Sequence, residues 1–166
     1  MKNKLQLLVI FALLWMASSC KNNQSATDSK SADEPIDMAE NIFIQVETTP
    51  CYGECPVYTL TIYQDSSIRY NGKMFTKKTG KFAGKAEAKH IEQIKNALEQ
   101  ASFFKLNRVY DDSSVTDLPT TIIAAQTEGK KNRVRARYNE PDSFRKLSSF
   151  LFEFIDELPL EQVETK

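Results

Sequence analysis

The sequence predicts an α+β domain, an antiparallel β-sheet of about five to six strands with two amphipathic helices packed on one face. Several segments alternate residue types with the two-residue period of a strand. Two other segments repeat apolar residues at three- and four-residue spacing, as a helix does. The order also matters, because strands in close succession favour hairpins, and interspersed helices then cover one face of the sheet.

The first strands are expected in the N-terminal half of the domain. Residues 41–48 (NIFIQVET) have the strand period, and β-branched and aromatic residues dominate PVYTLTIYQD at 56–65, as is typical of strands. A further strand at 67–70 ends at Asn71-Gly72, which predicts a tight turn. FTKKTGKFAGK at 75–85 predicts a strand pair or a bent strand.

The C-terminal half predicts both helices. The first occupies 86–104, with Ile91, Ile94, Leu98 and Ala101 on one stripe. Strands at 120–127 and 133–138 then flank a hairpin loop, EGKKN. The second helix begins near Pro141, which suits a first helical turn, and Pro159 ends it. Its apolar stripe comprises Phe144, Leu147, Leu151, Phe154 and Leu158.

The first nineteen residues resemble a secretory signal peptide. Lys2 and Lys4 precede an apolar run that is shorter than the roughly 20 residues of a membrane span. The run ends in MASSC, which resembles the lipobox of bacterial lipoproteins, with Ala17 where leucine is usual. This resemblance implies cleavage before Cys20 and attachment of acyl chains such as palmitate to its sulfur.

The predicted organisation follows from this start. A signal peptide at 1–19 precedes a lipidated Cys20 and a flexible polar tether at 20–38, a single domain at 39–160 and a C-terminal tail at 161–166. Acyl chains would hold the protein on a membrane of the cell envelope. Lys21, where aspartate would favour the inner membrane, indicates the outer membrane, on its periplasmic or surface face.

The charge balance argues against nucleic acid as a partner. The chain has 22 basic and 22 acidic residues, and loss of 1–19 with its two lysines leaves a net charge of about −2. Proteins that bind nucleic acid usually carry a broad basic surface. No cofactor is expected either.

The two cysteines in PCYGECP at 50–56 predict a disulfide. With Cys20 taken by lipid, Cys51 and Cys55 form an even pair in an oxidising compartment. A thiol–disulfide oxidoreductase normally uses C-x-x-C at a helix N-terminus, whereas this spacing is one residue longer and a strand follows. A zinc site needs four ligands, and His90 is the sole histidine in the sequence.

The same loop carries a family resemblance. PCYGECPVYTLTIYQDSSIRYNG begins with a P-C-x-G-x-C-P-x-Y pattern at 50–58, and VTDLPTTI contains T-D-x-P at 116–119. Together they resemble a bacterial domain family of unknown function that is common in lipoproteins of Bacteroidetes. The resemblance covers most of 47–158, although DSS stands at 65–67 where an Asp-Gly turn is common. It supports the fold and the location and transfers no catalytic residue.

A basic stripe is a candidate binding patch. Arg133, Arg135 and Arg137 alternate with other residues, so a strand would present all three on one face. Guanidinium groups suit phosphate-rich partners, such as an anionic head group, or an acidic envelope protein. The alternative is a solvated sheet face whose arginines pair with nearby glutamate side chains, and we favour this second interpretation.

No metal site and no catalytic residue are expected. Asp111, Asp112 and Asp117 could offer oxygens to a hard cation, but their spacing matches no calcium loop. Asp117 before Leu118-Pro119 better suits a turn. Nothing marks out a partner for His90 in catalysis, and neither G-x-S-x-G nor a glycine-rich phosphate loop occurs.

The sequence therefore favours a lipid-anchored envelope protein that acts as a non-catalytic binding or interaction domain of unknown specificity. The alternative is an envelope thiol-redox or hydrolytic accessory enzyme that uses Cys51 and Cys55 or the acidic loop. A sealed disulfide without a deep polar cleft would favour binding. An open disulfide beside a basic or histidine side chain in a pocket would favour redox chemistry.

Overall fold

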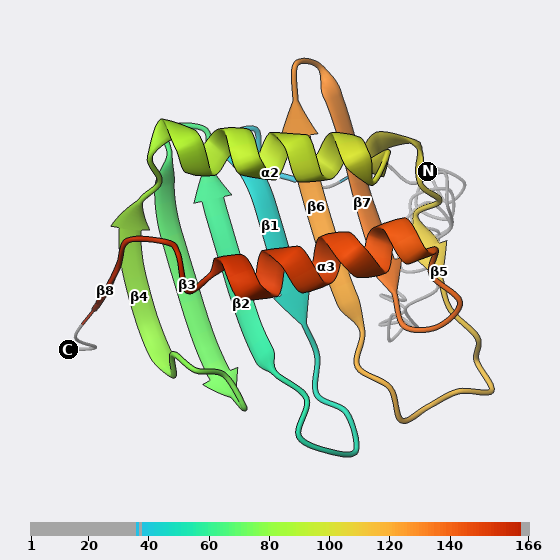
Figure 1. Cartoon of the computed structure of the whole chain (residues 1–166). Coiled ribbons are helices and arrows are strands. Elements are labelled where there is room, and N and C mark those ends of the chain that lie inside the picture. Colours follow the sequence, from blue (N-terminus) through green and yellow to red (C-terminus); the bar gives the residue numbers. More distant parts are fainter. Residues whose placement is uncertain (1–35, 37, 164–166) are drawn as a thin grey trace, which may run out of the picture. The chain divides into compact units, whose positions relative to one another are not determined.

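The computed structural model describes residues 36 and 38–163, which form a β-sheet with two helices on one side (Figure 1). In chain order the elements are β1 (Ile42–Thr48), β2 (Val57–Tyr63), β3 (Ser67–Met74), β4 (Gly80–Lys85), α2 (Ala88–Gln100), the short 3-10 helix η1 (Phe103–Lys105), β5 (Val109–Tyr110), β6 (Thr121–Thr127), β7 (Lys130–Ala136), α3 (Asp142–Phe154) and β8 (Leu160–Gln162). The mixed α+β architecture is as predicted.

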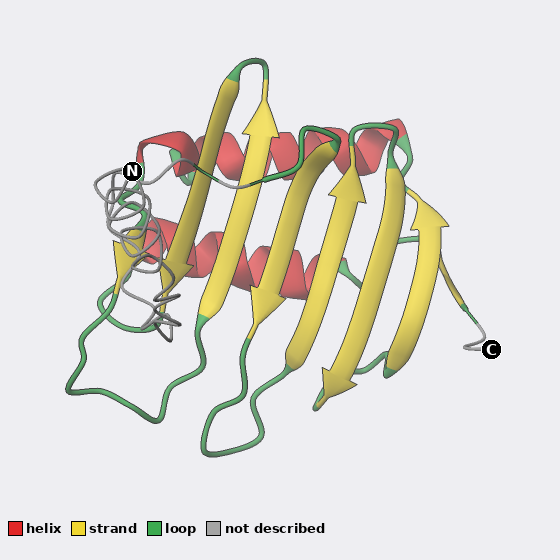
Figure 2. Ribbon diagram, turned by 180° about the vertical axis from the view of Figure 1, so that it is seen from behind, coloured by secondary structure: helices red, strands yellow, loops and turns green. Residues whose placement is uncertain are grey.

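The sheet has eight strands in the order β5-β7-β6-β1-β2-β3-β4-β8. Neighbouring strands are antiparallel, except that β5 and β7 are parallel. From behind, no helix of the described chain lies over the second face of the sheet (Figure 2). We call this side the open face.

The hydrophobic core lies between the sheet and the helices. Ile44 and Val46 of β1 are fully buried, whereas their neighbours Gln45 and Glu47 are half-buried. The predicted helical stripes supply the other side of the core, with Ile94, Leu98, Phe144, Leu147, Leu151 and Phe154. Each large apolar side chain that leaves water contributes roughly 1.5–3 kcal/mol, so these stripes hold both helices on the sheet.

The prediction of five to six strands was wrong, because the sheet has eight. The two further strands lie at the edges and are too short to show a period. β5 is two residues long within the expected polar loop, and backbone bonds such as Arg135 N–H to Arg108 O (2.8 Å) attach it to β7. β8 pairs with β4 and includes the first two residues of the expected tail at 161–166.

The expected turn at Asn71-Gly72 is instead part of β3, where Asn71 pairs with Thr59 and Gly72 with Tyr58. Gly72 is needed for a close approach. A Cβ at this position would lie 2.0 Å from the carbonyl oxygen of Lys78, so only glycine lets the segment after β3 fold back so closely.

The hairpin between β6 and β7 is tighter than predicted. Glu128 and Gly129 both have positive φ, at 46° and 78°, the conformation that a two-residue hairpin turn requires. β7 therefore begins at Lys130 rather than at Arg133. As a result Asn132 belongs to the strand, and its side chain is buried.

The predicted signal peptide at 1–19, Cys20 and most of the tether at 20–38 lie outside the described residues. Within the described part of the chain, no helix is long and apolar enough to cross a membrane.

Candidate binding surfaces

Cys51 and Cys55 form the predicted disulfide, with a Cα–Cα distance of 5.8 Å, in the loop between β1 and β2. The base of this loop is closed by Thr48. Its Oγ1 donates to the carbonyl oxygen of Pro56 (2.7 Å) and accepts from the backbone N–H of Tyr58 (3.1 Å). The disulfide therefore clips a loop whose two ends are already hydrogen-bonded.

The disulfide lies beside neither a helix N-terminus nor His90, and the N–H of Gly53 donates to Sγ of Cys51 at 3.2 Å. Both cysteines are half-buried, and strand β2 rather than a helix follows them. His90 lies elsewhere, in the first turn of α2, where its Nδ1 accepts the backbone N–H of Glu87 at 3.1 Å. The imidazole is buried against Phe154, with ring centroids 5.7 Å apart. His90 thus caps the helix and packs in the core.

The three predicted carboxylates of the acidic loop have separate structural roles. Asp111 binds two arginines, Asp112 accepts from the N–H and hydroxyl of Ser114, and the Asp117 carboxylate accepts from Thr116. Among residues 36 and 38–163, no group of three or more His, Cys, Asp or Glu side chains is placed to hold a metal ion.

The structure divides the arginine stripe. Arg135 and Arg137 donate to the two oxygens of Asp111, at 2.8 and 2.6 Å. Burial raises the pKa of the Asp111 carboxyl, but these hydrogen bonds from Arg137 and Arg135 outweigh it, so the pKa is lowered. Arg133 makes no salt bridge with another described residue. The free charge of the stripe therefore lies mainly at Arg133.

Sheet register places Arg133 in line with a second arginine on β3. Paired residues in adjacent strands point to the same face. The pairs run across the open face in one row: Arg133, Ala124, Gln45, Thr61 and Arg69. Four strand intervals separate the two arginines, which corresponds to about 19 Å.

Lys81 of β4 is a further cation on this face, and the same alternation places Lys85 of β4 and Lys131 of β7 there. Lys81 pairs with Asn71, the residue two positions after Arg69 on β3. A depression of about 560 Å³ lies beside Arg69 and Lys81, lined in part by Thr59, Thr61 and Asn71. Arg69 also lies 5.7 Å from the centroid of the Tyr63 ring. Neither Arg69 nor Lys81 makes a salt bridge within the described chain.

Sequence reasoning missed Arg69 and Lys81. The alternation of SIRY could have placed Arg69 opposite the buried Ile68 and Tyr70. The strand order could not be deduced from that pattern, and only the order brings both cations and Arg133 to one face.

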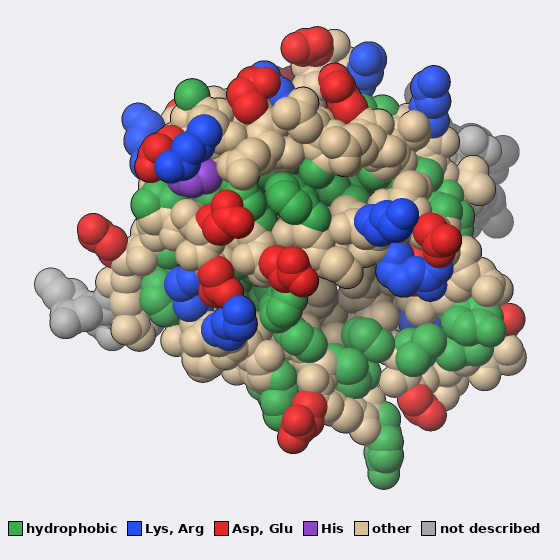
Figure 3. Space-filling model, viewed as in Figure 1, with side chains coloured by type: hydrophobic (Ala, Val, Ile, Leu, Met, Phe, Trp, Pro, Cys, Tyr) green, Lys and Arg blue, Asp and Glu red, His purple; other side chains and the backbone are tan. Residues whose placement is uncertain are grey.

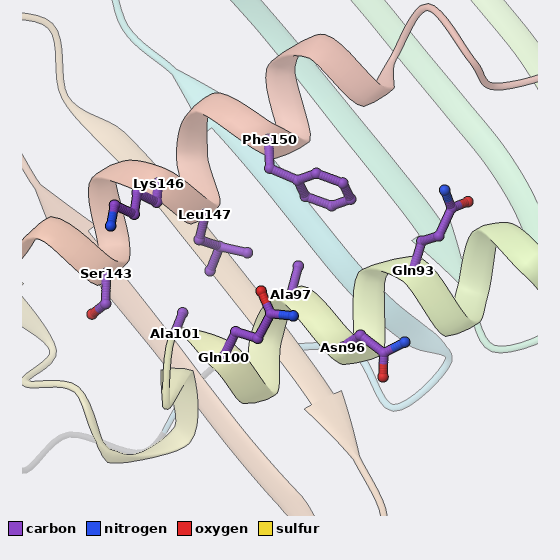
Figure 4. Close-up of a pocket in the computed structure, with 9 residues that line it drawn as sticks. All are labelled: Gln93, Asn96, Ala97, Gln100, Ala101, Ser143, Lys146, Leu147 and Phe150. Carbon is purple, nitrogen blue, oxygen red and sulfur yellow. The ribbon is translucent and has the colours of Figure 1, made fainter.

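A second depression, of about 510 Å³, lies between α2 and α3 on the helix side (Figure 4). Ala97 and Ala101 of α2 face Leu147 and Phe150 of α3 across it. The space-filling view shows hydrophobic side chains between the two helices (Figure 3). The rim is mainly uncharged, comprising Gln93, Asn96, Gln100, Ser143 and Lys146.

The two sequence motifs lie side by side at one end of the sheet. Thr49 after β1 donates its backbone N–H to Thr120 O (3.0 Å), and its hydroxyl accepts the N–H of Thr120 (2.9 Å). The N–H of Tyr52 donates to Asp117 O at 3.4 Å. The disulfide loop and the T-D-x-P segment therefore form one connected structure.

A family model described as Domain of unknown function (DUF6438) matches residues 42–155. The chain belongs to this family. The match runs from the first residue of β1 to the residue after α3, so the DUF6438 domain includes seven of the strands and both helices. No curated protein and no solved structure matches the chain.

Proposed function

We propose that this chain is a lipid-anchored protein of the bacterial cell envelope, of the kind found in Bacteroidetes, whose DUF6438 domain binds an anionic partner without catalysis. The observation that supports this proposal is a group of cations on the open face, among them Arg69, Lys81 and Arg133, without carboxylate partners in the described chain. Unpaired guanidinium and ammonium groups favour association with anions.

The chemistry of the open face suits a phosphate-bearing head group. Glu47 and, at the edge, Glu161 are its opposing carboxylates, so cations predominate once Asp111 has paired with its arginines. The depression beside Arg69 and Lys81 is lined in part by hydroxyl and amide side chains, which can hydrogen-bond phosphate and sugar oxygens, and otherwise by largely apolar side chains such as Phe82 and Val163. His90, Asp111 and Asp112, by contrast, make structural contacts within the domain.

The anchor is tested by mass spectrometry of protein from the cells that make it. We expect loss of residues 1–19 and an acylated Cys20, and Cys20→Ser should abolish the modification and release the protein from the outer membrane fraction. Recovery of an intact Met1 with an unmodified Cys20 would overturn the anchor and the envelope location together.

The binding face is tested by co-sedimentation with vesicles, using the chain from residue 20 onward with Cys20→Ser, so that neither the apolar residues 1–19 nor an acyl chain contributes. Vesicles of phosphatidylcholine with phosphatidylglycerol should bind it, and vesicles of phosphatidylcholine alone should not. Arg69→Ser, Lys81→Ser and Arg133→Ser together should reduce binding by about tenfold or more, because each basic residue near an anionic surface is worth about 1 kcal/mol.

A matched variant controls for net charge. Lys89→Ser, Lys95→Ser and Lys146→Ser remove three cations from α2 and α3, on the side away from the open face. This variant should bind vesicles almost as the parent does. Equal losses in both variants would mean that overall charge, rather than the open face, determines binding.

A further inference from the structure

Exposed large hydrophobic side chains gather at one end of the sheet. The described chain has seven such side chains. Five of them lie at the end of the sheet where β1, β3 and β7 finish, either at the end of a strand or in a loop there: Tyr52, Met74, Phe75, Leu118 and Tyr138. We call this set the loop-end patch. Figure 3 shows hydrophobic side chains across this lower end of the molecule. Single exposed apolar residues are ordinary, but a gathered set indicates an interaction surface.

Tyr52 is the most exposed member, with 93% of its surface in water. It nevertheless sits on a constrained backbone, between the two bonded cysteines and hydrogen-bonded to Asp117 O. A constrained aromatic side chain loses little conformational freedom on binding. Tyrosine is also among the residues that most often dominate binding energy at interfaces.

Phe75 gives an independent indication. Its φ is 54°, in the left-handed region, which is unfavourable for a bulky side chain and which glycine adopts freely. The phenylalanine is 54% exposed, so packing in the core of this domain does not compensate for the backbone conformation. Strain of this kind concentrates where a side chain has a functional role.

The charges around Tyr52 and Leu118 restrict the partner. Glu54, Asp112 and Asp117 lie in the same two loops, and none forms a salt bridge with a described residue. Beside Phe75 the charge is different, because Lys77 and Lys78 share the single carboxylate of Asp156 and Lys73 makes no salt bridge with a described residue. An anionic lipid surface, or the same loops of a second copy, placed against Tyr52 and Leu118 would bring like charges together, which is unfavourable.

We propose that the loop-end patch docks a folded envelope protein that offers an apolar pocket to Tyr52 and a basic rim to Glu54 and Asp117. This interaction goes beyond the anion-binding function because it uses a different surface, whose loops around Tyr52 and Leu118 carry unpaired carboxylates. In the described chain the patch lies at the opposite end of the sheet from the start of β1 (Figure 1).

Site-specific photocrosslinking of the full chain in its own cells tests this proposal. p-Benzoyl-L-phenylalanine replaces Tyr52 or, separately, Leu118. Both positions should give an adduct to the same protein, with the attachment point next to Lys or Arg residues. The same probe at Lys130, an exposed position at the opposite end of the sheet, should not give that adduct.

Charge reversal distinguishes docking from mere proximity. Glu54→Lys with Asp117→Lys should reduce the adduct yield from position 52 by about tenfold or more, because like charges then face each other. Glu99→Lys with Glu128→Lys makes the same change of net charge away from the patch and should leave the yield unchanged. Three outcomes would each overturn the proposal. The first is an adduct to a second copy or to lipid, the second is an adduct yield at positions 52 and 118 no greater than at 130, and the third is a yield that charge reversal does not change. The result of the phosphatidylglycerol vesicle assay is independent of this experiment, because vesicle binding depends on the open face and not on the loop-end patch.

Discussion

Arg137 donates from Nε to Oδ1 of Asp111 at 2.6 Å, and Arg135 donates to the other oxygen of the same carboxylate at 2.8 Å. Asp111 directly follows β5, and the parallel pairing of β5 with β7 brings it beside both arginines. The Asp111 and Arg137 side chains are each only 20% exposed. This cluster attaches the edge strand to the sheet and neutralises part of the basic stripe.

Asp111→Asn should lower the free energy of unfolding by about 1 kcal/mol at neutral pH, the upper end for a partly exposed pair. The pKa of Asp111 is lowered in the folded protein, because hydrogen bonds from Arg137 and Arg135 outweigh the effect of burial. A carboxyl with a lowered folded-state pKa contributes stability above its unfolded pKa of about 3.9 and loses it as pH falls through the folded value. Urea unfolding from pH 7 to pH 3 should therefore show a difference between the two proteins that shrinks below about pH 4.

Asp117→Asn is the comparison for that experiment, since Asp117 makes no salt bridge with a described residue. Its free energy of unfolding at pH 7 should match that of the parent. A difference between parent and Asp111→Asn that stayed constant down to pH 3 would show that the effect does not come from the ionised carboxylate.

The sequence alone could predict the strands and helices whose apolar residues recur with a strand or helix period. β1, β2, β6 and both helices were expected because burial on one side leaves an alternating or helical pattern of apolar residues. β5 and β8 were missed because a two- or three-residue edge strand depends on backbone bonds to a neighbour and not on its own side chains. The prediction of a turn at Asn71-Gly72 was wrong for a related reason. Gly72 is required by the close approach of the Lys78 carbonyl, and turn preferences of neighbouring residues do not reveal such a contact.

The candidate surfaces were predictable to a smaller extent. Cys51 and Cys55 could be paired because they are close in sequence and even in number. The partner of Arg135 and Arg137 could not, since Asp111 is brought to them by strand order. The same holds for the loop-end patch, because Tyr52, Phe75 and Leu118 lie far apart in sequence and only the strand order brings their loops to one end of the sheet.

Asn132→Ala should be more destabilising than the Asp111 change. The buried side chain donates from Nδ2 to the carbonyl oxygens of Phe103 (2.9 Å) and Leu106 (3.0 Å), and its Oδ1 accepts from Arg133 N–H (2.9 Å). It thereby fixes η1 against β7. Loss of the amide removes all three hydrogen bonds, although Phe103 O keeps the N–H of Leu106 (3.2 Å). A buried group left without a partner costs about 1–3 kcal/mol, so we expect a loss of about 2–4 kcal/mol in urea unfolding. Asn96→Ala, on the exposed side of α2, removes an amide that is not buried. This control should change stability by less than about 0.5 kcal/mol.

Removal of the disulfide should weaken the domain without unfolding it. Cys51→Ser with Cys55→Ser removes a disulfide between cysteines four residues apart. The chain-entropy model predicts that a disulfide closing a loop of this length stabilises the fold by about 2 kcal/mol. Urea unfolding should show that loss with an unchanged slope, because the core between sheet and helices is the same. Cys20→Ser, which lies outside the loop, should unfold as the parent does. A double variant as stable as the parent would contradict this prediction. The hydrogen bonds of Thr48 at the base of the loop would then be sufficient to hold the loop, and the disulfide would add no measurable free energy of unfolding.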